Sequence, residues 1–255
     1  MTRVDARTFD SLRPVEMTVG FHRLAEGSVL YRAGGTVVLC TASVDESVPK
    51  FMDPTAGRGW VTAEYLMHPR ANPKRQERDG RGRAPSGRTQ EIQRLVGRAL
   101  RAAVVLDKLG ARTITIDCDV LEADGGTRTA SITGGFVALA IALDKITQRK
   151  LLTVPVLRAP VAAVSAGIME SGEQLLDLCY IEDSRAEVDF NVVATGRGDV
   201  IELQGTAEGA PVPRKQIDTL VDLCLRGITL LTERQKAALS AANVNLDALV
   251  VGTGR

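Results

Sequence analysis

The sequence has few of the residues on which several common mechanisms depend. It contains only two histidines, His22 and His68, and neither lies in a motif, which argues against a two-histidine nuclease mechanism. Its four cysteines form no C-x-x-C pair and lie far apart in apolar segments, so we expect buried free thiols instead of disulfides or a zinc site. A Walker-type G-x-x-x-x-G-K-[ST] segment is absent, which argues against a P-loop NTPase.

Long apolar runs are also missing. No run approaches the roughly 20 residues needed to cross a bilayer, and the N-terminal segment lacks the apolar core of a signal peptide. We therefore expect a cytoplasmic protein with no membrane contact. The chain has 255 residues, 44% of them hydrophobic. This is enough for a hydrophobic core in one large domain or in two closely packed halves. Since the net charge is only +1, nucleic acid would have to bind a local basic patch.

The segment from Ile114 to Thr133 combines three local signals. Alternating apolar and polar residues predict a strand with one packed face. Gly125 and Gly126 then allow a tight turn and close approach of a ligand, and the apolar stretch after them predicts a buried helix. A helix start offers unpaired N–H groups, and Arg128 adds a guanidinium group, so this turn suits a phosphate. A glycine turn with a capping threonine and a surface arginine would give the same pattern.

The segment from His68 to Arg88 is strongly basic and contains glycine and proline but few large apolar residues. This composition predicts a mobile loop. Its charge favours contact with a phosphate backbone, although a solvated loop without a ligand has the same composition. The basic residues are Arg70, Lys74, Arg75, Arg78, Arg81, Arg83 and Arg88.

The remaining segments predict hairpins and helices in a repeated order. A first hairpin is expected over 27–44 with its turn at Gly34-Gly35, and a second over 161–181 with its turn near Ser171-Gly172. Helices are expected over 89–109 and 214–234 from the spacing of apolar residues. The second half thus repeats the plan of the first, which suggests an ancient duplication.

Five acidic residues fall within one short stretch and have no histidine or cysteine positioned to join them. Oxygen-only sites favour Mg²⁺ or Mn²⁺. If one strand continued through the stretch, Asp183, Glu187 and Asp189 would share a face. The alternative is a solvent-exposed edge strand that carries charged side chains and binds no metal. The five residues are Asp177, Glu182, Asp183, Glu187 and Asp189.

Taken together, these segments resemble the ribonuclease PH family of bacterial phosphate-dependent 3′→5′ exoribonucleases, and the resemblance runs through most of the chain. The motifs that carry it are LRP at 12–14, GSVL at 27–30, WVTAEY at 60–65, SGRTQEIQRLVGRALRA at 86–102, TITIDCDVLEADGGTRTASITG at 113–134, DLCYIEDSRAEVDFNVVAT at 177–195 and ELQGTAEGA at 202–210. The sequence departs from the family pattern at three places: Ala6 replaces the glycine of D-G-R, Ile181 the first glutamate of Y-E-E-D, and Phe190 the methionine of V-D-M-N.

The resemblance implies an α+β fold, with one domain over 1–255 built of two pseudo-symmetric halves, roughly 1–150 and 151–255. It implies a homohexamer assembled as a trimer of dimers. It also implies an enzyme, a tRNA nucleotidyltransferase, that uses inorganic phosphate to trim 3′ extensions of tRNA precursors, releases nucleoside diphosphates and adds nucleotides in reverse. An inactive RNA-binding ring subunit of the same fold and a small-molecule kinase of a related fold are the alternatives.

The resemblance also implies roles for individual residues. Phosphate would be bound by Arg88, Gly126, Thr127 and Arg128. Asp183 and Asp189 would be the catalytic pair associated with Mg²⁺ or Mn²⁺, and Asp183 is in addition a candidate proton donor to the leaving 3′ oxygen. The arginines that would guide RNA are Arg70, Arg75 and Arg78.

Overall fold

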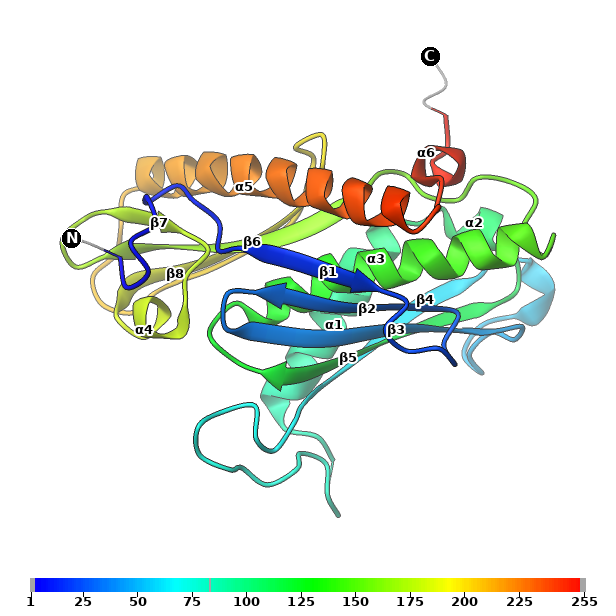
Figure 1. Ribbon diagram of the computed structural model, residues 1–255, viewed down its shortest axis with the longest axis horizontal. Coiled ribbons are helices and arrows are strands. Elements are labelled where there is room, and N and C mark those ends of the chain that lie inside the picture. The colour runs from blue at the N-terminus through cyan, green and yellow to red at the C-terminus, as the bar shows by residue number, and fades with distance from the viewer. Residues whose placement is uncertain (1–2, 83, 253–255) are drawn as a thin grey trace.

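The computed structural model describes residues 3–82 and 84–252, so Arg83 of the basic segment lies outside the described residues. Two β-sheets pack against long helices, and the second sheet is formed entirely by residues that follow the first in the chain (Figure 1). The predicted α+β class is confirmed.

The first sheet has five strands in the order β1-β2-β3-β5-β4, with β4 and β5 parallel and the other pairs antiparallel. The first predicted hairpin is confirmed as β2 and β3, and its turn is possible because Gly34 takes a φ of 55°. No strand was predicted over β1, which precedes the first hairpin and pairs with β2. The strands are β1 (Val15–Val19), β2 (Gly27–Ala33), β3 (Thr36–Asp45), β4 (Trp60–Met67) and β5 (Thr113–Glu122).

The second sheet has four antiparallel strands in the order β7-β6-β8-β9. The second predicted hairpin is confirmed as β6 and β7, with Gly172 at a φ of 87° in the turn. Its second strand ends at Leu176 instead of continuing to Ile181, because Tyr180 and Ile181 belong to α4. In β8 the apolar residues Val188, Phe190 and Val192 alternate with polar ones, a pattern that predicts a strand with one packed face, and these three residues face the core. The strands are β6 (Val161–Met169), β7 (Gln174–Leu176), β8 (Ala186–Thr195) and β9 (Val200–Ala207).

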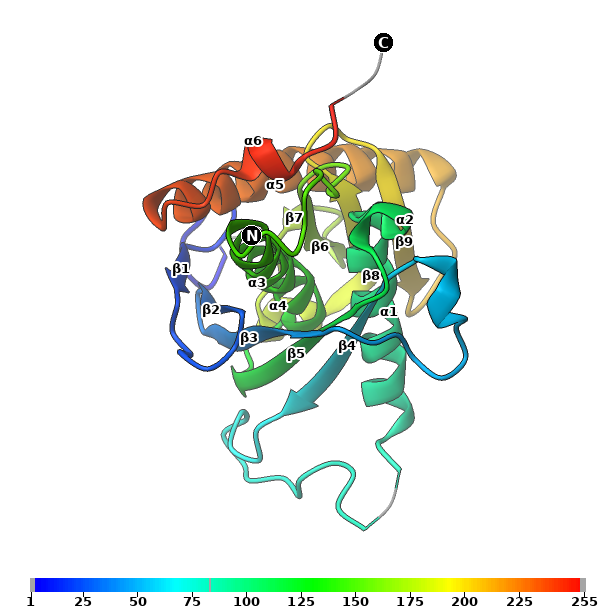
Figure 2. The ribbon, with the colours of Figure 1, turned by 90° about the vertical axis from the view of Figure 1, so that its right-hand side faces the viewer.

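The helix after the glycine pair, α3, forms the centre of the molecule between the first sheet and α5 (Figure 2). It is long and apolar enough to cross a membrane, contrary to our expectation from the sequence, but 83% of its apolar window is buried inside the protein. Its apolar character is therefore accounted for by the core. The helices are α1 (Gly87–Ala102), α2 (Leu106–Leu109), α3 (Thr127–Gln148), α4 (Tyr180–Asp183), α5 (Arg214–Ala241) and α6 (Leu246–Leu249), with a 3-10 turn over Pro54–Ala56.

The predicted helix over 89–109 is divided in the structure. α1 ends at Ala102, because the next residues leave the helix and pair with a distant segment: Val104 forms a β-bridge with Leu157. Helix α2 then follows and ends at Leu109, and its C-cap is Gly110, whose φ is 76°. Helix α5 begins where predicted but continues past the expected end to Ala241. Pairing between distant segments thus overrides local helix propensity at α1.

All four cysteines are free and buried, as predicted. Cys40 and Cys118 lie on neighbouring strands of the first sheet and both point at the carbonyl oxygen of Ser131, at 3.9 and 3.7 Å from their sulfur atoms. Burial is one cause of the raised pKa of the Cys40 thiol, after its hydrogen bond to Cys118. These thiols therefore belong to the core.

Ala6 occupies a backbone conformation that suits glycine. It is exposed and has a φ of 59°. Because a Cβ is unfavourable in that region, we expect Ala6→Gly to raise the free energy of unfolding by about 1 kcal/mol. The matched control is Ala237, which is exposed within α5. We expect Ala237→Gly to lower the free energy of unfolding by about 1 kcal/mol. Urea unfolding of both variants measures this, and a loss of stability in Ala6→Gly would contradict the expectation.

Candidate active site

The turn between β5 and α3 has the geometry of an anion-binding turn. Gly125 and Gly126 take φ values of 75° and 64°, and Gly126 is the N-cap of α3. The N-cap is therefore a glycine and not the threonine that the sequence also allowed. Because glycine has no side chain, no N-cap side chain binds the first N–H groups of the helix. Thr127 instead places its hydroxyl 2.9 Å from the phenolic oxygen of Tyr65. Free N–H groups at a helix start attract an anion.

Two arginines from different helices lie beside this turn. Arg128 is in the first turn of α3, is 19% exposed, and its Nη2 lies 3.3 Å from a carboxylate oxygen of Glu91. Arg88 is the second residue of α1. Burial raises the pKa values of Asp183 and Asp189, and the charges of Arg128 and Arg88 offset part of this rise. The structure therefore brings the predicted phosphate residues and the predicted carboxylates to one place.

The two carboxylates reach the site from different elements. Asp183 ends the short helix α4, and Asp189 lies on β8, so the idea that one strand carries both side chains is wrong. Both are half-buried, and burial raises the pKa of each above its usual range. The negative charge of Asp183 raises the pKa of Asp189 further. Two carboxylates that repel each other in this way favour a shared cation or proton.

The other three acidic residues do not join this pair. Asp177 is bound by Arg13 and Glu182 by Arg3, each with an N–O distance of 2.7 Å, and Glu187 is exposed on β8. Over residues 3–82 and 84–252, no group of three or more histidine, cysteine or acidic side chains could hold a metal ion. The predicted five-residue acidic constellation is thus reduced to two oxygen donors. Two donors still fit Mg²⁺, which usually binds one or two carboxylates and completes its shell with water and substrate phosphates.

A hollow of about 460 Å³ opens beside the pair and is walled by β9. Gln204 on β9 donates from Nε2 to Glu91 at 3.1 Å, and Asn191 donates to Asp189 at 3.4 Å. Neither Glu91, Asn191 nor Gln204 was a candidate from the sequence, although all three lie in motifs that carry the family resemblance. The hollow is lined by Glu91, Arg128, Asp189, Asn191, Leu203, Gln204, Gly205 and Thr206.

The basic loop extends away from the body of the molecule between β4 and α1 (Figure 2). Arg70, Arg75 and Arg78 are exposed on it, and among the described residues none of the three is hydrogen-bonded through its side chain to the phosphate turn or the carboxylates. Asp79 closes the base of the loop, because its carboxylate accepts bonds from the hydroxyls of Ser86 at 2.7 Å and Thr89 at 2.6 Å. These bonds lower the pKa of Asp79 to about 2. The loop is thereby attached beside Arg88.

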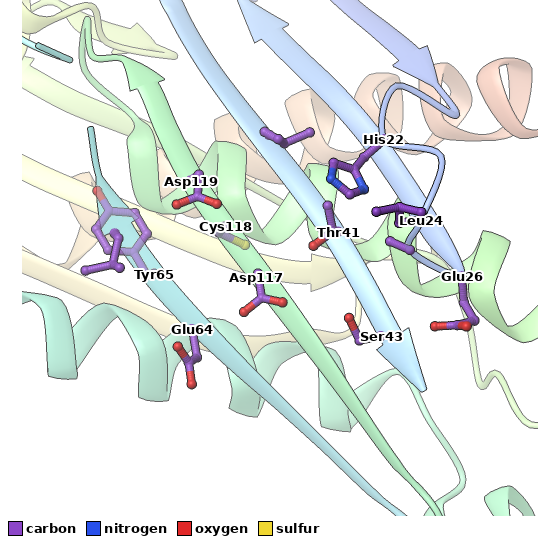
Figure 3. Close-up of a pocket in the computed structure, with 13 residues that line it drawn as sticks. His22, Leu24, Glu26, Thr41, Ser43, Glu64, Tyr65, Asp117, Cys118 and Asp119 are labelled. Carbon is purple, nitrogen blue, oxygen red and sulfur yellow. The ribbon is translucent and has the colours of Figure 1, made fainter. Parts of the chain in front are cut away.

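A second hollow, of about 450 Å³, lies on the outer face of the first sheet (Figure 3). Glu64, Asp117 and Asp119 project into it from β4 and β5. Burial, followed by the charges of Glu64 and Asp119, raises the pKa of Asp117. Burial also raises the pKa of Asp119, and the charge of Arg78 in the basic loop offsets part of this rise. This acidic face contains none of the predicted phosphate or catalytic residues.

The raised pKa values give an expected pH dependence. Asp183 and Asp189 would have to be ionised to hold a metal ion. Because their pKa values lie above the ordinary aspartate value of 3.8, we expect activity to decline, as the pH is lowered, before the pH reaches 3.8. Since Mg²⁺ competes with protons, more Mg²⁺ should move this acid limb to lower pH. Turnover against pH at two Mg²⁺ concentrations measures this. Activity that rises as the pH falls would instead assign Asp183 the role of proton donor.

A two-sheet α+β fold that sets an anion-binding helix start and two arginines against a carboxylate pair defines a protein equipped for phosphoryl transfer. Two family models match the chain, the 3′ exoribonuclease family, domain 1 over residues 11–143 and the 3′ exoribonuclease family, domain 2 over residues 159–227. The chain belongs to the 3′ exoribonuclease family.

One relative supports this assignment, and two solved structures share the fold. A protein named Ribonuclease PH from Crocosphaera subtropica is 54% identical over 240 residues, which span 94% of this chain and 98% of that protein. The structure of rice (Oryza sativa) Rrp46 has a TM-score of 0.75 at 18% identity, over 93% of this chain and 100% of its own. The Archaeoglobus fulgidus exosome with RNA bound to the active site has a TM-score of 0.75 at 25% identity, over 91% and 92%. The family resemblance found in the sequence is therefore confirmed.

Proposed function

We propose that the protein is a phosphorolytic 3′→5′ exoribonuclease. It uses inorganic phosphate to remove nucleotides from the 3′ ends of tRNA precursors, releases nucleoside diphosphates, and adds nucleotides in the reverse reaction. The near full-length similarity to a protein named Ribonuclease PH supports this activity. The observation that carries it is that Arg128 and Asp189 line one hollow, where the charges of Arg88 and Arg128 act on both Asp183 and Asp189.

The residues present suit phosphate as the nucleophile. Inorganic phosphate is already anionic, so it needs orientation and charge compensation more than a strong base. Arg88, Arg128 and the N–H groups at the start of α3 supply both. Arg88 is exposed, whereas the side chain of Arg128 is only 19% exposed, so the charge of Arg128 interacts more strongly than it would in water. Thr127 adds a hydroxyl whose position is fixed by its contact with Tyr65. These groups hold the phosphate against the 3′-terminal phosphodiester.

Asp183 and Asp189 would hold a Mg²⁺ or Mn²⁺ ion. When bound, that ion would offset negative charge on the scissile phosphate and the leaving 3′ oxygen. Burial raises the pKa of Asp189 most, and the negative charge of Asp183 raises it further; this repulsion supports binding of a cation by the pair.

The reverse reaction gives a direct test of the proposed function. Incubation of the protein with an RNA primer, Mg²⁺ and a nucleoside diphosphate should lengthen the 3′ end and release inorganic phosphate. A nucleoside monophosphate serves as the control substrate, because it has no phosphoanhydride bond to break. Extension with a nucleoside triphosphate and release of pyrophosphate would assign a different reaction.

The RNA-guiding role of the basic loop predicts a selective defect. Replacing Arg70 and Arg75 with alanine should raise the KM for tRNA precursors and flatten its salt dependence, because fewer counterions are released on binding. Turnover of short oligonucleotides should be spared. Arg214→Ala with Arg234→Ala removes the same charge from exposed positions on α5 and is the control. An unchanged salt slope in the loop variant would contradict this role.

Ring assembly as a homohexamer is part of the proposal, and it rests on the family to which the chain belongs. Sedimentation should give a particle of six chains, and a monomer alone would overturn the ring. A catalytically inactive ring subunit is disfavoured because Arg88, Arg128, Asp183 and Asp189 are all present and converge. We place the enzyme in the cytoplasm, where four free thiols would remain reduced.

A further inference from the structure

The turn that carries the phosphate residues and the turn that carries Asp183 are in direct backbone contact, although they lie far apart in the sequence. A Cβ on Gly125 would lie 2.7 Å from the carbonyl oxygen of Leu178 and 2.8 Å from the backbone nitrogen of Tyr180, so only glycine fits there. Beside it, Asp124 accepts a hydrogen bond from the backbone N–H of Tyr180 at 3.2 Å. Tyr180 is the first residue of α4, which ends at Asp183.

Arg13 joins the same two turns with one buried side chain. Its Nη1 donates to the carbonyl oxygen of Asp124 at 2.6 Å, and its Nε and Nη2 donate to the two carboxylate oxygens of Asp177 at 3.1 and 2.7 Å. The backbone N–H of Arg13 also donates to Asp177 at 2.8 Å. The side chains of Arg13 and Asp177 are only 3% and 8% exposed. A planar guanidinium group fixes both direction and distance between its partners.

Asp177 is held in a conformation that it would not adopt alone. Its φ is 55°, in the left-handed region that favours glycine. Its backbone N–H donates to Ser165 at 2.6 Å, and its carbonyl oxygen accepts from Arg3 at 3.1 Å. A strained residue persists only where its surroundings fix it. The chain that leads into α4 therefore starts from a point determined by Arg13, Arg3 and Ser165.

We infer that Arg13 and Asp124 are positioning residues that set the distance between the phosphate turn and Asp183. This inference rests on the proposed function. In-line attack requires the phosphate and the leaving oxygen to be held in register, and a displacement of about 1 Å can cost about 10²-fold in rate. Neither residue is required to touch the substrate. The hydrogen bond from Asp124 to α4 and the bridge made by Arg13 both fix the distance between the phosphate turn and Asp183.

Substitutions at Asp124 test the inference without removing the buried ion pair. Asp124→Ala deletes the acceptor for the Tyr180 N–H, whereas Asp124→Asn retains a carbonyl oxygen at that place. With saturating phosphate and RNA, we expect kcat to fall about tenfold in Asp124→Ala and to stay near the wild-type value in Asp124→Asn. RNA affinity measured without phosphate should be unchanged in both. Wild-type kcat in Asp124→Ala would overturn the inference, because a purely structural role would lower only the unfolding temperature.

Arg13→Lys provides the second arm. Lysine keeps the charge but cannot reach Asp124 and both oxygens of Asp177 together, so we expect kcat to fall about 10²-fold. The matched control is Arg112→Lys, because Arg112 binds the carboxylate of Glu46 and two backbone carbonyls next to the other end of β5. Equal losses in the two lysine variants would overturn the inference.

The two arms also separate the inference from the proposed function. If the wild-type protein releases no nucleoside diphosphate, the proposed function fails. If the wild type is active and Asp124→Ala matches it, only the positioning role fails. Should Arg13→Lys not fold, the Asp124 pair decides the outcome alone.

Discussion

Replacing Arg128 with alanine should lower phosphorolysis by about 10²-fold or more. Loss of one preorganised charge at a transferring phosphate typically has an effect of this size. Arg128 stands in the first turn of α3, beside the free N–H groups, and its charge acts on both Asp183 and Asp189. Steady-state kinetics with phosphate as the varied substrate should show a raised KM for phosphate as well as a lower kcat.

The control for Arg128→Ala is Arg94→Ala, since Arg94 is an exposed arginine on α1 outside the site. Arg94→Ala should leave the kinetics within about twofold of wild type. The pairing of Arg128 with Glu91 at 3.3 Å indicates that the guanidinium group is directed into the hollow beside β9. Near-normal turnover in Arg128→Ala would show that Arg128 does not bind the attacking phosphate.

Asp183→Asn should lower turnover by at least about 10²-fold, because the neutral amide cannot offset a cation as a carboxylate does. The Asp183→Asn variant should also need a higher Mg²⁺ concentration than the wild type to reach its half-maximal rate. Glu187→Gln is the matched control: Glu187 lies in the same acidic stretch but is exposed on β8. Rates measured over a Mg²⁺ titration compare the two variants. An Asp183→Asn enzyme with wild-type turnover would show that the carboxylate pair is not catalytic.

The elements around the phosphate turn could be predicted because their signals are local. Alternation in β5, the glycine pair and the apolar run of α3 are each visible within a few residues, and the structure has the strand, turn and helix in that order. The same holds for the apolar face of β8 and for both hairpins. In these segments the local preferences and the tertiary contacts agree.

The placement of Asp183 could not be predicted, because contacts with the N-terminal segment determine it. Arg3 binds Glu182 with two hydrogen bonds, of 2.8 and 2.7 Å, and Arg13 binds Asp177, so the acidic stretch folds into a turn and a short helix instead of one strand. No spacing rule within the stretch reveals partners more than 150 residues away. The end of α1 is a similar case, since Leu157 pairs with Val104 from a distant segment.

The most direct test of the account is a time course on an RNA with a short single-stranded 3′ tail, in Mg²⁺, with and without inorganic phosphate. The released nucleotides are identified in each reaction. We expect nucleoside diphosphates to appear only with phosphate, because the phosphate held by Arg88 and Arg128 becomes part of the product. Nucleoside monophosphates released in the absence of phosphate would mean hydrolysis and would contradict the central claim.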